Sequence, residues 1–268
     1  MSDLVLMEVG KYTIKNRVFK NGYGSYERVI NGLQKYKKYS SWISIQASIP
    51  YGKQLKREVR ELWKIGAEEV LANHTGESAF LNTKKFKMTK ENHENYMKEW
   101  KEISNEMIDN IIKYGHTPTI YTTISLLERI HNRNLRSKGC GAGRAISVLS
   151  NEEISLCQGF VGLDGYVIGN LDEGIDKIKL EKFGELFVKH LKKCENCWAK
   201  NICTTGCIAQ SAMYNELDDE FEPSRTCNKA KEMVEFVIYL YNKLRKAKTV
   251  NLDKLFPQKT LYQQPITL

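Results

Sequence analysis

The first 139 residues of this 268-residue chain contain no cysteine, and all seven cysteines lie from Cys140 onward. The chain also lacks any apolar run near the ~20 residues that a membrane-spanning helix needs. Its start has no basic segment followed by an apolar stretch, so we expect no secretory signal and a cytoplasmic location. An odd number of cysteines in an unexported chain points to metal ligands or reactive thiols. These absences argue against a membrane protein and against a disulfide scaffold.

The overall composition is that of an ordinary globular protein. Hydrophobic residues make up 41% and aromatic residues 10% of the chain, which argues against intrinsic disorder. The net charge is +9, from 41 Lys and Arg against 32 Asp and Glu. The lysines are scattered, and no recognition helix or RNA-binding signature accompanies them. We therefore interpret them as solvated surface and expect no nucleic-acid partner.

The cysteine-free half alternates between strand and helix patterns. Two segments fit strands and two fit amphipathic helices: strands at 41–48 and 69–72, helices at 53–65 and about 90–113. Gly66 is expected to end the first helix and Thr89 to cap the second. This order predicts a parallel sheet built from βαβ units. Two or three units are too few for an eight-stranded barrel of ~250 residues, so we expect a partial barrel or a small open sheet.

The cysteine-rich half carries a four-cysteine run with the spacing C-x2-C-x5-C-x3-C. The run is Cys194, Cys197, Cys203 and Cys207; Cys227 follows it, and Cys140 and Cys157 precede it. Thiolates bind zinc or iron–sulfur clusters. One zinc takes four tetrahedral ligands, which would leave three cysteines without a role. Two metal centres use all seven, and a 4Fe–4S cluster accepts ligands from distant segments. The spacing thus predicts metal and favours iron–sulfur over zinc, with zinc as the alternative.

These cysteines, in this order and with Gly141 and Gly143 beside the first, resemble a SPASM domain. That is the auxiliary iron–sulfur domain that follows the barrel of radical SAM enzymes that modify peptides and proteins, such as anaerobic sulfatase maturases. All seven cysteines match the family pattern. One departure is Glu152, which stands where the family has a glycine in a turn before Cys157.

The resemblance implies two 4Fe–4S clusters with separate ligand sets. By position, auxiliary cluster I would be held by Cys140, Cys157 and Cys207. Auxiliary cluster II would be held by Cys194, Cys197, Cys203 and Cys227. Cys207 lies between ligands of the other set in the chain, so cluster loading is expected to fold this half cooperatively.

The resemblance extends upstream but leaves out the radical centre. Residues 15–26 are similar to the segment after the fourth barrel strand of radical SAM maturases. The C-x3-C-x2-C spacing that holds the catalytic cluster of the family occurs nowhere in the chain. Gln46 stands where many relatives direct an arginine to S-adenosylmethionine, and an amide cannot replace a bidentate guanidinium. We therefore assign no S-adenosylmethionine-binding or catalytic residue, and do not expect radical enzyme activity from the chain alone.

The expected architecture is α/β. It comprises a partial radical SAM-type barrel over 1–137, an irregular α+β SPASM iron–sulfur domain over 138–246 and a tail over 247–268. The expected role is in a peptide- or protein-modification system, binding a substrate peptide or passing electrons to a separate radical SAM subunit. Two alternatives stay open: the C-terminal part of an otherwise active radical SAM maturase, and a zinc-stabilised binding module.

Overall fold

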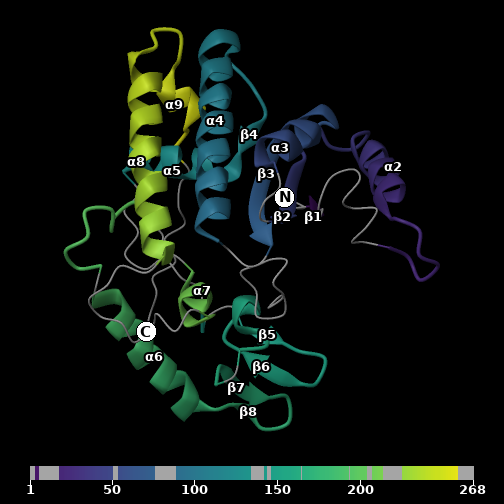
Figure 1. Cartoon of the computed structure of the whole chain (residues 1–268), viewed down its shortest axis with the longest axis vertical. Helices are drawn as coiled ribbons and strands as arrows, with labels where there is room; N and C mark the ends of the chain where they lie inside the picture. Colours follow the sequence, from purple (N-terminus) through teal and green to yellow (C-terminus); the bar gives the residue numbers. More distant parts are fainter. Residues whose placement is uncertain are drawn as a thin grey trace.

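The computed structural model describes most of the chain. The described residues are 4–5, 18–50, 54–75, 89–133, 142–143, 146–163, 165–192, 194–203, 207–213 and 225–258. They form one parallel and one antiparallel sheet, each with four strands. Figure 1 shows the antiparallel sheet and the nearby helix α6 (Lys177–Lys192) at one end of the molecule. The long helices α4 (Lys90–Tyr114) and α8 (Arg225–Lys246) lie toward the other.

The parallel sheet confirms the predicted βαβ organisation. Its strands run in the order β1 (Leu4–Val5), β2 (Ser44–Pro50), β3 (Glu69–Thr75) and β4 (Thr119–Ile120). The connecting helices are α2 (Tyr26–Tyr36), α3 (Leu55–Lys64) and α4 (Lys90–Tyr114). The strand predicted over 41–48 lies at 44–50 instead, because β2 pairs with β3 as far as Pro50 opposite Thr75. Each helix returns the chain to the same end of the sheet, as parallel pairing requires.

Both predicted helix-boundary residues are confirmed. Gly66 has a φ of +95° after α3; its N–H bonds to the Trp63 carbonyl at 2.9 Å, and that of Ala67 to the Leu62 carbonyl at 3.0 Å. This pair of bonds is a Schellman motif, in which glycine takes the left-handed position at little cost. At the start of α4, the Thr89 hydroxyl accepts a hydrogen bond from the Asn92 N–H at 3.1 Å.

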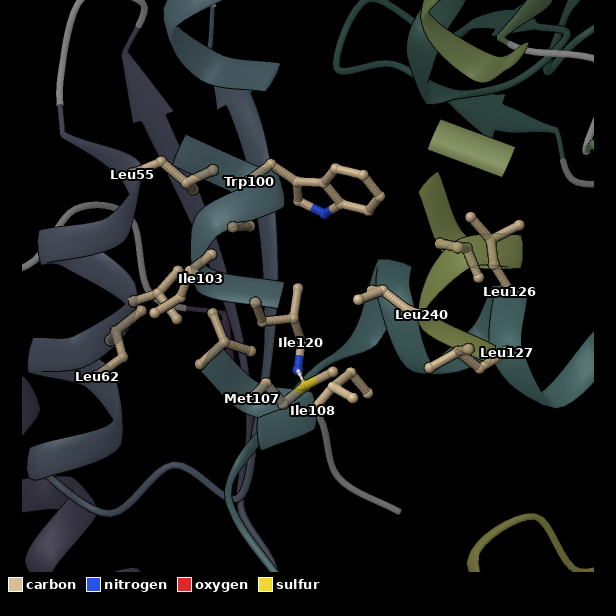
Figure 2. Packing of buried hydrophobic residues seen from close by; sticks show 14 of the residues in the cluster. Leu55, Leu62, Trp100, Ile103, Met107, Ile108, Ile120, Leu126, Leu127 and Leu240 are labelled. Atoms are coloured by element: carbon tan, nitrogen blue, oxygen red, sulfur yellow. Dashed lines mark hydrogen bonds between the residues drawn. The ribbon is translucent and has the colours of Figure 1, made fainter. Parts of the chain in front are cut away.

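One face of the parallel sheet is buried under helices. Ile45, Ala47 and Ile49 alternate along β2 and are at most 1% exposed. They belong to the main core, the larger hydrophobic cluster, which also takes in the buried faces of α3 and α4 (Figure 2). The intervening Ser44, Gln46 and Ser48 are half-buried on the opposite face.

A backbone-to-sulfur hydrogen bond joins α4 to β4. The Ile120 N–H donates to Met107 Sδ at 3.2 Å, and both residues are at most 1% exposed. Figure 2 shows the two residues facing each other in the main core. A thioether is a weak acceptor, but a buried N–H without any acceptor costs about 1–3 kcal/mol.

We therefore expect Met107→Leu to destabilise the protein by about 1–3 kcal/mol more than Met97→Leu. Met97 lies on the same helix and is 2% exposed, so it matches Met107 in burial. Leucine is close to methionine in volume, so the control change is expected to cost less than ~1.5 kcal/mol. Denaturant unfolding with both variants measures the difference. Equal losses would show that the N–H to sulfur bond contributes nothing.

The second half of the chain begins with α5 and a small meander. The helix α5 (Tyr121–Asn132) leads to strands β5 (Ser147–Val148), β6 (Glu153–Ser155), β7 (Val167–Asn170) and β8 (Gly174–Ile175). The short helix η3 (Gln158–Phe160) follows β6. This meander carries the small core, the second hydrophobic cluster, whose buried members are Ile154, Leu156, Phe160, Ile168, Phe183, Ile208, Ala209 and Ala212.

The last helices are α7 (Ile208–Met213), α8 (Arg225–Lys246) and α9 (Leu252–Leu255). Cys227 lies inside the first turn of α8. Hydrophobic packing crosses the domain boundary proposed near residue 138, because α8 belongs to the main core. Its buried residues there are Val234, Val237, Leu240 and Leu244. No described helix is long and apolar enough to cross a membrane.

Ion pairs flank α4 on both sides. Lys56 and Arg60 of α3 pair with Glu102 and Glu106, while Glu232 of α8 pairs with Lys101 at 2.7 Å. The hydrogen bond from Lys56 lowers the pKa of the Glu102 carboxyl. These pairs are partly solvated, so each contributes little by itself. Together they place α3 and α8 on opposite sides of α4, consistent with the packing of the main core.

Candidate metal-binding site

Six of the seven predicted cysteine ligands lie in described residues, and Cys140 lies outside them. Cys207 is exposed, and the other five are half-buried; these are Cys157, Cys194, Cys197, Cys203 and Cys227. Among the described residues, no three His, Cys, Asp or Glu side chains are grouped so that they could hold a metal ion. The two predicted ligand sets therefore remain predictions. The structure does show which cysteine-bearing segments pack against each other and against which hydrophobic core.

The segments next to Cys140 and Cys157 lie side by side. The Gly143 N–H donates to the carbonyl of Leu156, the residue before Cys157, at 2.9 Å. Gly143 has a φ of +80°, a left-handed conformation that favours glycine. Ala142 and Cys157 both pack against the small core. Cys157, and Ala142 two residues after Cys140, thus pack against the same hydrophobic core.

The start of α7, next to Cys207, meets the segment after Cys157. A Cβ atom added to Gly159 would lie 3.0 Å from the Ala209 Cβ and 3.6 Å from Cys157 Sγ. A side chain at position 159 would therefore require Ala209 to give way by a few tenths of an ångström. Ile208 and Ala209, the two residues after Cys207, are buried in the small core. Ala142, Cys157 and the start of α7 therefore meet at the small core.

The segment from Cys194 to Cys203 forms consecutive tight turns beside the main core. The Cys197 N–H donates to the Cys194 carbonyl at 3.1 Å, and the Cys203 N–H donates to the Ala199 carbonyl at 2.7 Å. Cys197 and Cys203 pack against the main core, and Ala199 between them is fully buried in it. Cys227 is carried by α8, which packs on the same core. Of the predicted ligands of auxiliary cluster II, Cys197 and Cys203 therefore pack on the main core, and Cys227 is carried by a helix of that core.

Cys157 packs on the small core, whereas Cys197 and Cys203 pack on the main core. The donor type suits zinc or an iron–sulfur cluster, because both take several thiolates. Among the described residues, the cysteine side chains are not grouped around a metal position, and the two ligand sets stay predictions.

The turn before Cys157 keeps a left-handed residue despite lacking the glycine of the family. Glu152 has a φ of +68°, and its N–H donates to the Leu149 carbonyl at 3.0 Å. Its own carbonyl accepts from the Leu171 N–H at 3.0 Å, which joins the turn to the end of β7. The departure at position 152 therefore changes the residue and not the turn, at a cost of about 1–2 kcal/mol for a side chain in this conformation.

Because of that strain, we expect Glu152→Gly to raise the free energy of unfolding by about 1 kcal/mol. Thermal unfolding should register this as a rise of about 2–4 °C in Tm. Glu153→Gly is the control: it changes the neighbouring residue in β6, where glycine should cost about 0.5–1 kcal/mol. A Tm that falls for both variants would mean that the turn is not strained.

Comparison with known proteins gives a match only at the level of structure. No protein-family model matches the sequence, and no curated protein sequence matches it significantly. Among solved structures, anSMEcpe with bound AdoMet and Cp18Cys peptide aligns with a TM-score of 0.66 at 19% identity, over 90% of this chain and 69% of that one. The chain therefore shares the fold of anSMEcpe over the aligned part. Native anSMEcpe with AdoMet gives the same score and identity, over 68% of its own length.

This likeness to an anaerobic sulfatase-maturating enzyme confirms the predicted fold family at the level of fold alone. The mixed α/β architecture, with one parallel and one antiparallel sheet, agrees with the expectation. The division into a barrel and a separate SPASM domain, and the binding of clusters, stay predictions.

Gln46, the position where the family arginine is missing, is half-buried on the face of β2 that faces away from the main core. It pairs in register with Leu71 of β3. On the same face, the Ser44 hydroxyl donates to Glu69 Oε1 at 2.9 Å. The structure thus places a neutral amide at this position, beside a serine–carboxylate pair.

Proposed function

We propose that this chain is an iron–sulfur protein of a peptide- or protein-modification system and that it binds two 4Fe–4S clusters. The observation that supports the proposal is that Cys157 packs on the small core while Cys197 and Cys203 pack on the main core, as expected if they belong to different ligand sets. The fold of anSMEcpe, whose structures contain AdoMet and a peptide, supports the same class of system.

The chain's own residues hold the clusters and keep the cysteine segments together. Cys157, Cys207 and Cys140 serve auxiliary cluster I; the remaining four cysteines serve auxiliary cluster II. Gly143 supplies a left-handed turn bonded to Leu156, and Gly159 allows Ala209 to approach closely beside the small core. A 4Fe–4S cluster supplies one-electron transfer when it is bound. The chain contains no C-x3-C-x2-C spacing, so its role is to bind a substrate peptide or to pass electrons to a radical SAM subunit.

A second candidate is favoured by the unequal coverage in the structural alignment. The chain is matched over 90% of its own length but over only 69% of anSMEcpe. Part of that enzyme therefore has no counterpart here, and this chain would be the C-terminal portion of a radical SAM maturase. The discriminating observation is an in-frame C-x3-C-x2-C motif in the genomic sequence upstream of Met1.

Anaerobic reconstitution with iron and sulfide tests the proposal. We expect brown protein with about eight iron and eight sulfide per chain, since each cubane cluster has four of each. Iron, sulfide and zinc are measured on the same sample. Colourless protein that retains one or two zinc ions and no sulfide would overturn the proposal and favour the zinc-stabilised binding module.

A further inference from the structure

Arg129 reaches from the helical layer to the cysteine turns. It lies near the end of α5, half-buried, and its Nη1 donates to the carbonyl of Ile202 at 3.2 Å. The two residues are 73 positions apart in the chain. Leu126 and Leu127 hold α5 in the main core, with exposed fractions of 8% and 0%. The guanidinium is therefore presented by an anchored helix rather than by a loop.

The contact falls beside a predicted ligand. Ile202 immediately precedes Cys203, and both residues pack against the main core. The N–H groups of Ile202 and Cys203 both donate to the Ala199 carbonyl, at 3.0 and 2.7 Å. Arg129 donates a further hydrogen bond, to the carbonyl of Ile202. The backbone on the N-terminal side of Cys203 is thus held by its own turn and by a cation from α5.

We propose that Arg129 is a positioning residue for auxiliary cluster II, which rests on the proposed function. It fixes Cys203 for ligation, and its charge raises the midpoint potential of the cluster. A 4Fe–4S cluster with four thiolate ligands carries a net negative charge that grows on one-electron reduction. A nearby cation stabilises the reduced form more than the oxidised form.

Three variants of the full-length chain separate these two effects. Arg129→Gln keeps an N–H donor but removes the charge, and Arg129→Met removes both while keeping an apolar stem. Arg133→Gln is the matched control, because Arg133 is an exposed arginine at the C-terminal cap of the same helix. Each variant is reconstituted anaerobically and titrated with dithionite while EPR follows both clusters, and iron and sulfide are counted.

We expect Arg129→Met to lose about half of the iron, since one cluster of two is affected. Arg129→Gln should keep its iron but shift one midpoint to a more negative potential, with the other unchanged. Arg133→Gln should match the wild type in both measurements. Far-UV circular dichroism checks that each variant is folded. If Arg129→Met does not fold, the comparison of Arg129→Gln with the wild type decides the question.

Two results would overturn the inference, and they are distinguishable. If the wild type binds two clusters and both Arg129 variants keep its iron content and potentials, the role of Arg129 is overturned and the proposed function stands. A wild-type chain that binds no iron would overturn the proposed function and this inference with it.

Discussion

A fragment of residues 138–268 is expected not to fold by itself, even after anaerobic reconstitution. It contains all seven cysteines, but α8 would lose the helices on which it packs. Val234, Val237, Leu240 and Leu244 are at most 1% exposed, in a core shared with α4 and α5. Fully exposing four such side chains costs about 6–12 kcal/mol, at about 1.5–3 kcal/mol each. That cost is comparable with the whole stability of a typical domain, about 5–15 kcal/mol.

Circular dichroism and thermal melting of the fragment measure this directly. Co-expression of residues 1–137 as a separate chain is the control, because it returns the missing surface without restoring the covalent link. We expect it to recover soluble, folded fragment. Cooperative melting of 138–268 alone would contradict the prediction and would support an independent SPASM domain with the proposed boundary near residue 138.

Cys207→Ala is expected to lose more iron than Cys227→Ala. Cys207 immediately precedes α7, and its carbonyl accepts from the Ser211 N–H at 3.1 Å. The helix packs against both η3 and α8, and so lies between the segments of the two predicted clusters. Loss of this thiolate removes one of the three ligands of auxiliary cluster I and loosens the link to auxiliary cluster II. Loss of Cys227 leaves the small core, and auxiliary cluster I with it, unaffected.

Iron and sulfide counts after reconstitution test this prediction. Cys227→Ala should keep about four iron per chain, the content of one cubane cluster, and Cys207→Ala should keep fewer. Cys157→Ala is the control, because it removes a ligand of the same predicted set and leaves the residue that precedes α7 unchanged. Equal, independent losses in all three variants would speak against a bridging role for Cys207.

Sequence reasoning succeeded where the signal is local. Thr89 caps the start of α4 and Gly66 follows the end of α3, as predicted. Both signals are local, because a capping or left-handed residue acts on backbone groups within a few positions of itself. The apolar faces of α3 and α4 were predictable for the same reason. The edge strands β1 and β4 were not predicted, because a two-residue strand carries no detectable alternation and is defined by its pairing.

The contacts that matter most for the site could not be predicted in this way. Arg129 meets Ile202 across 73 positions, and Ile120 meets Met107 through a sulfur acceptor that no pattern encodes. The cysteine sets came from motif resemblance, whereas their association with two separate cores appears only when distant segments are packed together.

If each core serves its own cluster, the two clusters can be removed one at a time. Native mass spectrometry of reconstituted Cys157→Ala and Cys197→Ala, beside the wild type, measures this. We expect two cluster masses on the wild-type chain, each of about four iron and four sulfide, and one on each variant. The double variant should carry none. A wild-type mass that corresponds to zinc, or two single variants that each lose both clusters, would contradict it.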